Sequence, residues 1–344
     1  MSIKLALLGV SLVAGSAAAQ VKATDQISGT KQLLIAVSPV NERVVWASGT
    51  RGTWVRTTDG GTTWLTGQVP GADSLQFRDV HAVSAESAWL LSIGDSLHSR
   101  IFHTADGGAH WTQQYVVTDP KDFLDCFGFW DAKHAIVIGD SNDGHVVMLR
   151  TVDGGAHWTR VPSATLPPAG AGEGSFAASG LCVATQTGGR GWAVMSNVDR
   201  ARLLRTSDYG RSWSVDTLPL TTRTDAGPTA VIFRDRRHGM VLGATGNNPI
   251  ESDVLIAATS DGGKHWSPRG KPAFKQGVSG GVFVRGAKVP TVVAAGWTGA
   301  AYTTNDGVTW TAIDSNNYWS VGFASPKAGW AVGQNGRITK LSGF

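Results

Sequence analysis

Short runs of apolar residues recur along the chain, and most of them end in glycine. Each run is four or five residues long and almost uninterrupted by polar side chains. This pattern is typical of a strand buried on both faces and is too short for a buried helix. The runs predict seven buried strands, at residues 45–49, 88–91, 135–139, 191–194, 239–243, 292–296 and 329–333.

A polar phrase follows six of these runs and reads Thr-x-Asp-Gly-Gly-x-x-Trp or a close variant. Its Asp carboxylate can accept hydrogen bonds from backbone N–H groups of the following turn, and its Gly residues supply the positive φ of a tight hairpin. We therefore expect a structural hairpin in every copy, with the Trp covering the turn. The paired positions are Asp59 and Trp64, Asp106 and Trp111, Asp153 and Trp158, Asp208 and Trp213, Asp261 and Trp266, and Asn305 and Trp310.

Successive Trp positions of this phrase lie 47, 47, 55, 53 and 44 residues apart, which is the period of a four-stranded propeller blade. The phrase resembles the Asp-box, or BNR, repeat. Six copies with seven buried strands predict an all-β chain, a single seven-bladed β-propeller of four-stranded blades over residues 20–344. Because the last run is followed by one strand at 337–341, its blade lacks a strand. We expect residues 21–28 to supply it and close the ring.

Residues 1–19 have the pattern of a cleavable signal peptide. Lys4 precedes an apolar stretch at residues 5–14, and three alanines at 17–19 offer a cleavage site after Ala19. The stretch is too short to span a bilayer, and no later segment has 18 uncharged apolar residues. We therefore expect an exported monomer, periplasmic or secreted, with no membrane span.

Composition and cysteine content exclude two function classes. Charged residues are 16% of the chain and the net charge is +4, with the basic residues scattered, so a nucleic-acid partner is not expected. Cys126 and Cys182 are too few for the usual zinc sites. An oxidising compartment would permit a disulfide between them. The interpretation that we favour is two small buried thiols on neighbouring inner strands.

Longer stretches of the chain resemble a known family. The stretches are FRDVHAV at 77–83, FWDAKH at 129–134, GEGSFAASG at 172–180 and FRDRRHG at 233–239. In this order they are similar to exported bacterial proteins grouped with photosystem II stability/assembly factor-like propellers. The resemblance covers essentially the whole mature chain and implies a seven-bladed Asp-box propeller. Photosynthetic members of the family hold a client protein, so the resemblance also implies a protein partner.

Candidate binding residues gather where a propeller usually holds its ligand. Loops that enter the innermost strands share one face, the tunnel face, with the loops between second and third strands, and we expect a protein or glycan partner there. Within this set four carboxylates, at positions 79, 95, 125 and 140, form a candidate acidic cluster; the alternative is that they are solvated or cap turns. The candidates are Arg51, Arg78, Asp79, Asp95, Asp125, Asp140, Glu173, Trp297 and Trp319.

Patterns for catalysis, cofactors and metals are few. Residues 277–281 match G-x-S-x-G, but a nucleophile elbow needs a helix that an all-β chain does not offer. No dinucleotide loop or H-E-x-x-H motif occurs, so we predict no cofactor and no metal. A glycoside hydrolase is the alternative function, because Asp-box propellers include sialidases and xyloglucanases. Its catalytic candidates are Asp79 and Asp125, although the chain lacks the Arg-Ile-Pro start of sialidases.

Overall fold

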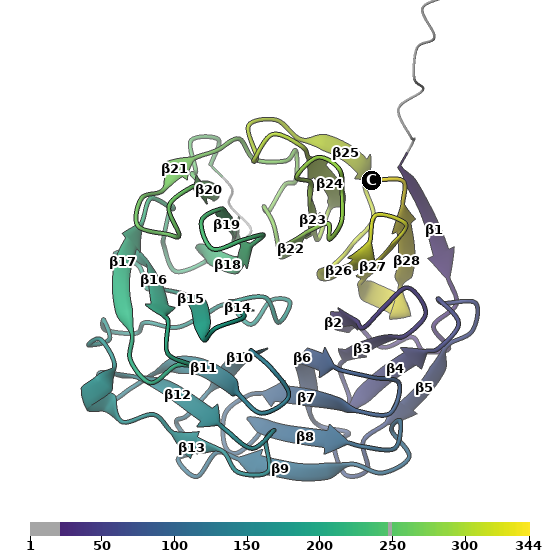
Figure 1. Ribbon diagram of the computed structural model, residues 1–344, viewed down its shortest axis with the longest axis horizontal. Coiled ribbons are helices and arrows are strands. Elements are labelled where there is room, and N and C mark those ends of the chain that lie inside the picture. Colours follow the sequence, from purple (N-terminus) through teal and green to yellow (C-terminus); the bar gives the residue numbers. More distant parts are fainter. Residues whose placement is uncertain (1–20, 247–249) are drawn as a thin grey trace, which may run out of the picture.

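Seven four-stranded antiparallel sheets form a ring around a central axis (Figure 1). The computed structural model describes residues 21–246 and 250–344, so the expected signal peptide at residues 1–19 lies outside the described residues. The prediction of an all-β, seven-bladed propeller is confirmed. The described residues include two single-turn 3-10 helices, η1 (Ser163–Thr165) and η2 (Gln334–Gly336). Nothing helical in this part of the chain has the length and apolar character needed to cross a membrane.

In blades 1 to 6 the first strand in sequence lines the tunnel and the next strands follow outward. Blade 1 contains β2 (Leu34–Pro39), β3 (Val45–Gly49), β4 (Thr53–Thr57) and β5 (Leu65–Gln68); blade 2 contains β6 (Gln76–Ala82), β7 (Ala88–Ile93), β8 (Arg100–Thr104) and β9 (Thr112–Val116); blade 3 contains β10 (Leu124–Phe129), β11 (Ala135–Asn142), β12 (His145–Thr151) and β13 (Thr159–Arg160). Blade 4 contains β14 (Val183–Gln186), β15 (Arg190–Ser196), β16 (Ala201–Thr206) and β17 (Ser214–Leu218); blade 5 contains β18 (Ala226–Phe233), β19 (Gly239–Thr245), β20 (Ile256–Thr259) and β21 (Ser267–Pro268); blade 6 contains β22 (Gly280–Phe283), β23 (Val292–Gly296), β24 (Gly299–Thr303) and β25 (Thr311–Asp314).

Blade 7 is completed by the N-terminal strand, as the sequence predicts. It consists of β26 (Ser320–Ser325), β27 (Ala328–Val332), β28 (Ile338–Ser342) and β1 (Lys22–Gln26). Strand β1 pairs antiparallel with β28, from Lys22 opposite Ser342 to Gln26 opposite Ile338. The first and last strands of the fold therefore share one sheet, and β1 covers the edge of β28 that would otherwise be unpaired.

The predicted buried runs form the second strand of each blade. Every residue of β3, β19, β23 and β27 is buried. These strands lie between neighbouring blades, so both of their faces pack against apolar side chains. Trp46 of β3 and Trp330 of β27 are fully enclosed. Burial on both faces explains why the runs read as continuous rather than alternating apolar sequence.

Each polar phrase forms the hairpin between the third and fourth strands of its blade, on the face opposite the tunnel face. In the first copy, Thr57 Oγ1 donates to Asp59 Oδ1 (2.8 Å) and accepts from the Gly61 N–H (2.9 Å). Asp59 Oδ1 also accepts from the Thr63 N–H (2.9 Å). Gly61 has a φ of 86°, and a Cβ there would lie within 2.1 Å of Gln26 Oε1. The carboxylate and the glycine therefore have the structural roles that the sequence predicts.

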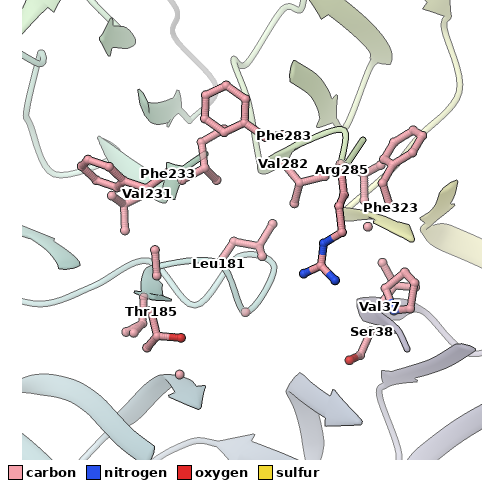
Figure 2. A pocket seen from close by; sticks show the side chains of 18 of the residues that line it. Val37, Ser38, Leu181, Thr185, Val231, Phe233, Val282, Phe283, Arg285 and Phe323 are labelled. Atoms are coloured by element: carbon pink, nitrogen blue, oxygen red, sulfur yellow. The ribbon is translucent and has the colours of Figure 1, made fainter. Parts of the chain in front are cut away.

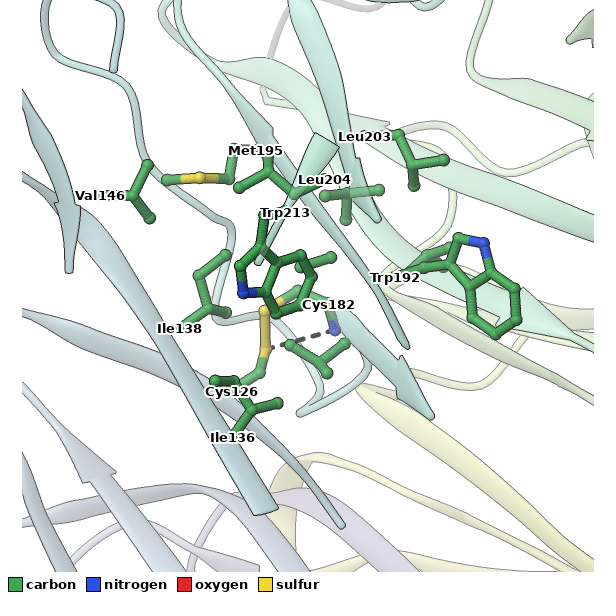
Figure 3. Packing of buried hydrophobic residues seen from close by; sticks show 14 of the residues in the cluster. Cys126, Ile136, Ile138, Val146, Cys182, Trp192, Met195, Leu203, Leu204 and Trp213 are labelled. Atoms are coloured by element: carbon green, nitrogen blue, oxygen red, sulfur yellow. Dashed lines mark hydrogen bonds between the residues drawn. A yellow bond between two sulfur atoms is a disulfide. The ribbon is translucent and has the colours of Figure 1, made fainter. Parts of the chain in front are cut away.

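The favoured expectation of two free thiols is wrong. Cys126 of β10 and Cys182, which directly precedes β14, form a disulfide with 5.9 Å between their Cα atoms. Both residues are fully buried in the core between blades 3 and 4, beside Ile138 and Trp213 (Figure 3). The inner strands of neighbouring blades approach closely enough at this point for a covalent bond. The bond also anchors the segment that leads into blade 4.

Residues 175–181, here called the plug segment, cross the tunnel before blade 4 begins. The carbonyl of Ala177 accepts from Arg78 Nη1 of blade 2 (2.9 Å), and the carbonyl of Ser179 accepts from Ser320 Oγ of blade 7 (3.1 Å). The Leu181 carbonyl accepts from the Val231 N–H of blade 5 (3.0 Å). Because the segment is bonded to blades on different sides of the axis, it separates the tunnel face from the rest of the tunnel.

Candidate functional site

The residues predicted for the tunnel face come from four kinds of position. Arg51 lies in the β3–β4 turn and Asp95 in the β7–β8 turn, and both are exposed. Trp297 lies in the β23–β24 turn, and Trp319 directly precedes β26. Glu173 belongs to the connection between blades 3 and 4. The remaining candidates lie on strands near the axis: Arg78 and Asp79 on β6, Asp125 on β10 and Asp140 on β11.

Asp125 and Asp140 form a carboxyl pair in which Asp125 is buried and Asp140 half-buried. Asp125 is 0% exposed, and in the described part of the chain neither of its oxygens has a hydrogen bond of good geometry, although the Asp140 carboxyl and the Ser175 amide lie next to it. Burial, followed by the neighbouring Asp140, raises the pKa of Asp125 well above its usual value. Burial also raises the pKa of Asp140, whose Oδ1 accepts from the Ser175 N–H at 3.1 Å. Two adjacent carboxyls with raised pKa values favour a state in which a proton is held between them.

Arg78 connects this pair to two tryptophans. Its guanidinium lies over the Trp319 ring, 5.2 Å from the centroid, and Trp319 meets Trp297 edge-on at 5.5 Å. Burial lowers the pKa of Arg78, while the charge of Asp125 opposes this shift. Among the described residues neither indole N–H has an acceptor, although both nitrogens are covered. We refer to Arg78, Trp297, Trp319, Asp125 and Asp140 as the tunnel-face patch.

Two predicted site residues have structural partners instead. Asp79 Oδ2 accepts from the Phe127 N–H of blade 3 (2.9 Å), and burial raises the pKa of Asp79. Its carboxylate also lies against Gly180 of the plug segment, where a Cβ would come within 2.4 Å of Oδ1. Glu173 forms a buried ion pair with Arg202 (2.5 Å) and accepts from the Gly170 N–H (2.7 Å). Asp79 therefore joins blade 2 to blade 3, and Glu173 holds the connection between blades 3 and 4 in place.

The four candidate carboxylates therefore do not form one cluster. Asp125 and Asp140 are adjacent, and the exposed Asp95 contributes to the raised pKa of Asp140. The raised pKa of Asp79 has burial as its largest cause, and the other causes are hydrogen bonds from the Phe127 and Val80 amides. Asp79 lines the cavity on the other side of the plug segment from the tunnel face. In the described residues, no group of three or more His, Cys, Asp or Glu side chains is arranged to hold a metal ion.

Sequence reasoning missed a cavity on the other side of the plug segment. The cavity is open on one side, has a volume of about 710 Å³ and is bordered by the C-terminal halves of the inner strands. Val37, Val231, Phe283 and Phe323 are among the side chains that surround it (Figure 2). Phenylalanines recur at the ends of the inner strands, at 129, 233, 283 and 323. This repeat is the sequence signal that marks the ends of the inner strands around the cavity.

No protein-family model and no curated protein matches this sequence. Solved structures with the same fold include YCF48 bound to a D1 peptide, with 18% identity and a TM-score of 0.62 over 94% of this chain and 96% of that chain. YCF48 from Cyanidioschyzon merolae has 16% identity and a TM-score of 0.63, over 93% and 98%. The GH74 xyloglucanase from Xanthomonas campestris has 13% identity and a TM-score of 0.62, over 93% of this chain and 53% of that chain. These similarities show a shared propeller fold, which a peptide-bound protein and a hydrolase have in common.

Proposed function

We propose that this chain is an exported, non-catalytic propeller, periplasmic or secreted, that binds a segment of a partner protein on its tunnel face. The observation that carries the proposal is the stacking of Arg78 on Trp319 beside Trp297, with all three side chains half-buried. Arg and Trp are the residue types that contribute most to binding at protein interfaces.

The charge of the patch suits a peptide as well. Arg78 offers a cationic donor, and the half-buried Asp140 and the exposed Asp95 near it offer acceptor oxygens. An extended peptide presents alternating N–H and C=O groups, so it can use both kinds of partner. The similarity to YCF48, solved with a bound D1 peptide, supports the same class of partner. A glycan, stacked on the tryptophans, is the alternative ligand for the same surface.

The arrangement of the carboxylates does not favour the glycoside hydrolase. A glycosidase needs two carboxyl groups about 5–10 Å apart on either side of an accessible sugar. Asp125 is fully enclosed and lies next to Asp140, whereas Asp79 is bonded to the Phe127 amide below the plug segment. The chain also covers only 53% of the xyloglucanase that it resembles in fold.

The proposal is tested by screening residues 20–344 against peptide and glycan arrays, together with a panel of glycosidase substrates. Peptides that bind are then titrated against three variants. We expect Trp319→Ala and Arg78→Gln each to weaken peptide binding about tenfold or more. Lys264→Gln is the control, because this exposed lysine lies in the fifth Asp-box hairpin on the opposite face, and it should bind normally.

Three results would contradict the proposal. Peptide binding that survives both patch variants would place the partner elsewhere. Binding to glycans alone would select the alternative ligand. Turnover of a glycosidase substrate that is lost in folded Asp125→Asn would show an enzyme.

A further inference from the structure

The cavity behind the plug segment is a blind pocket that faces the Asp-box side of the propeller. Its walls come from the last residues of the inner strands, including Val37 of β2 and Phe323 of β26. Its inner end is formed by Ser179, Gly180 and Leu181, and Leu181 stands between the walls in Figure 2. The pocket is therefore separated by the plug segment from the tunnel-face patch.

The size of this pocket suits a small organic molecule, and its lining mixes apolar with polar side chains. Its volume of about 710 Å³ lies within the range of about 300–1,000 Å³ that is typical of ligand sites. Half-buried apolar side chains border the space from different sides, among them Val37, Leu181 and Val282 (Figure 2). The rings of Phe233 and Phe323 pack outward, Phe233 on Trp192 and Phe323 against Phe344. An elongated or aromatic hydrocarbon group would be in contact with protein on several sides.

A single unpaired cation reaches into the pocket. The β22–β23 turn spans residues 284–291 and is longer than the five-residue turns at 40–44, 83–87 and 130–134. Arg285 extends from this turn, and its guanidinium points toward the middle of the cavity (Figure 2). Arg285 is exposed, and within the described residues it takes part in no ion pair or hydrogen bond. Its planar donor group is therefore free for a ligand.

The other ionisable groups of the lining do not compensate this charge. Asp79 is the one carboxylate among the lining residues, and burial raises its pKa, which favours the uncharged acid. Burial lowers the pKa of His81 to about 4, so this ring is neutral at physiological pH. Arg234 is already paired with Asp306 at 3.2 Å. The pocket thus combines walls that are partly apolar, at Val37, Leu181 and Val282, with one uncompensated positive charge.

We infer that this pocket binds an amphipathic organic anion, whose hydrocarbon body lies between the inner strands and whose anionic group is bound by Arg285. The guanidinium can donate two parallel hydrogen bonds to a carboxylate, sulfonate or phosphate group. Because Asp79 and His81 offer no full charge, the pocket discriminates against cations and accepts a neutral molecule only weakly. This site is independent of the partner-binding patch on the tunnel face.

Decanoate is a suitable probe, and calorimetric titration of the mature chain, residues 20–344, measures its binding. We expect saturable binding at one site, with decanamide and decyltrimethylammonium at least about tenfold weaker. Arg285→Gln should weaken decanoate about tenfold or more and leave decanamide unchanged, because only the anionic contact is lost. The matched control is Lys288→Gln, since Lys288 lies in the same turn, is exposed and does not line the pocket.

A second variant tests the location without removing charge. Val282→Trp fills the cavity next to Arg285 and should abolish decanoate binding, with the melting temperature showing whether the variant is folded. If Val282→Trp does not fold, the decanoate affinities of Arg285→Gln and Lys288→Gln still test whether Arg285 binds the anionic group. The inference is overturned if decanoate does not bind at millimolar concentration, if Arg285→Gln binds it as tightly as the unmodified chain, or if decanamide binds equally well.

Discussion

The side-chain oxygen of Gln26 accepts a hydrogen bond from the indole N–H of Trp330, 304 residues later in the chain, at 3.2 Å. The same oxygen accepts from the indole N–H of Trp64 in the first Asp-box hairpin, also at 3.2 Å. Its amide nitrogen donates to the Gly60 carbonyl. One glutamine on the N-terminal strand therefore connects the first blade with the last, at the point where the ring closes.

Replacing Gln26 should weaken this closure. Gln26→Ala leaves the indole N–H of the fully enclosed Trp330 without its acceptor, which we expect to lower the free energy of unfolding by about 1–3 kcal/mol. Urea unfolding followed by tryptophan fluorescence measures the change. Lys22→Ala is the matched control, because Lys22 lies on the same strand and is exposed. Equal stability of the two variants would show that the strand pairing alone closes the ring.

The disulfide should stabilise the fold and order the plug segment. Cys126 and Cys182 are 56 residues apart, and a crosslink of this kind contributes about 2–4 kcal/mol. We expect the Cys126→Ser/Cys182→Ser double variant to lose stability in this range and to exchange the Leu181 and Val183 amide hydrogens faster. Hydrogen exchange with mass spectrometry measures the second effect. Unchanged exchange in the plug segment, despite lower stability, would confine the role of the bond to the blade 3–blade 4 core.

The Asp-box carboxylates should contribute to acid unfolding. The Thr63 N–H and hydroxyl, and then the Thr57 hydroxyl, lower the pKa of Asp59 from 3.8 to about 2. A carboxyl whose pKa is lower in the folded state stabilises the fold above its unfolded pKa, and this contribution disappears as the pH falls from 3.8 toward about 2. We therefore expect Asp59→Asn to lose less stability than the unmodified chain between about pH 5 and pH 2.5.

The sixth hairpin provides the reference for this variant. Asn305 there accepts from the Thr309 N–H and donates to the Thr309 hydroxyl, at 3.0 and 2.9 Å. Asp59→Asn has a threonine at the equivalent place, Thr63, so the hairpin should form at neutral pH. Urea unfolding of Asp59→Asn and the unmodified chain, at about pH 5 and about pH 2.5, measures the loss of stability in each. An unchanged pH dependence would assign acid unfolding to other carboxyls.

The sequence was sufficient to predict the ring because its repeats act locally. Asp59, Gly61 and Thr63 form their hairpin within a few residues, and the buried strands are recognisable from continuous apolar runs. The position of β1 could also be predicted, since an incomplete last blade needs one strand. These features depend on spacing along the chain, which the sequence displays directly.

The parts that the sequence did not predict depend on contacts across the tunnel. The plug segment lies in a connection whose residues 161–182 carry no repeat, so its hydrogen bond to Ser320 could not be anticipated. The disulfide depends on how closely two inner strands approach, which composition does not give. The placement of Asp79 against Gly180, away from Asp125, follows from the same segment. Arg285 reaches the cavity only because its turn is long.

The carboxyl pair on the tunnel face should destabilise the protein at neutral pH. Burial and the neighbouring Asp140 raise the pKa of Asp125 above its usual 3.8, so the folded state retains a proton that the unfolded chain releases. Asp125 therefore opposes folding increasingly as the pH rises above 3.8. Asp125→Asn replaces the protonated acid by a group of the same shape. We expect it to raise the free energy of unfolding by about 1–3 kcal/mol near pH 7 and to have little effect near pH 4.

Unfolding in urea at several pH values measures this difference, with Asp199→Asn as the control, because Asp199 is exposed in the β15–β16 turn on the same face. The control should leave stability unchanged at every pH. If Asp125→Asn is instead less stable than the unmodified chain at pH 7, the carboxylate is ionised in the folded protein and stabilised by Arg78. In that case Arg78→Gln should cause a similar loss of stability. If Asp125 is neutral, Arg78→Gln should affect partner binding more than stability.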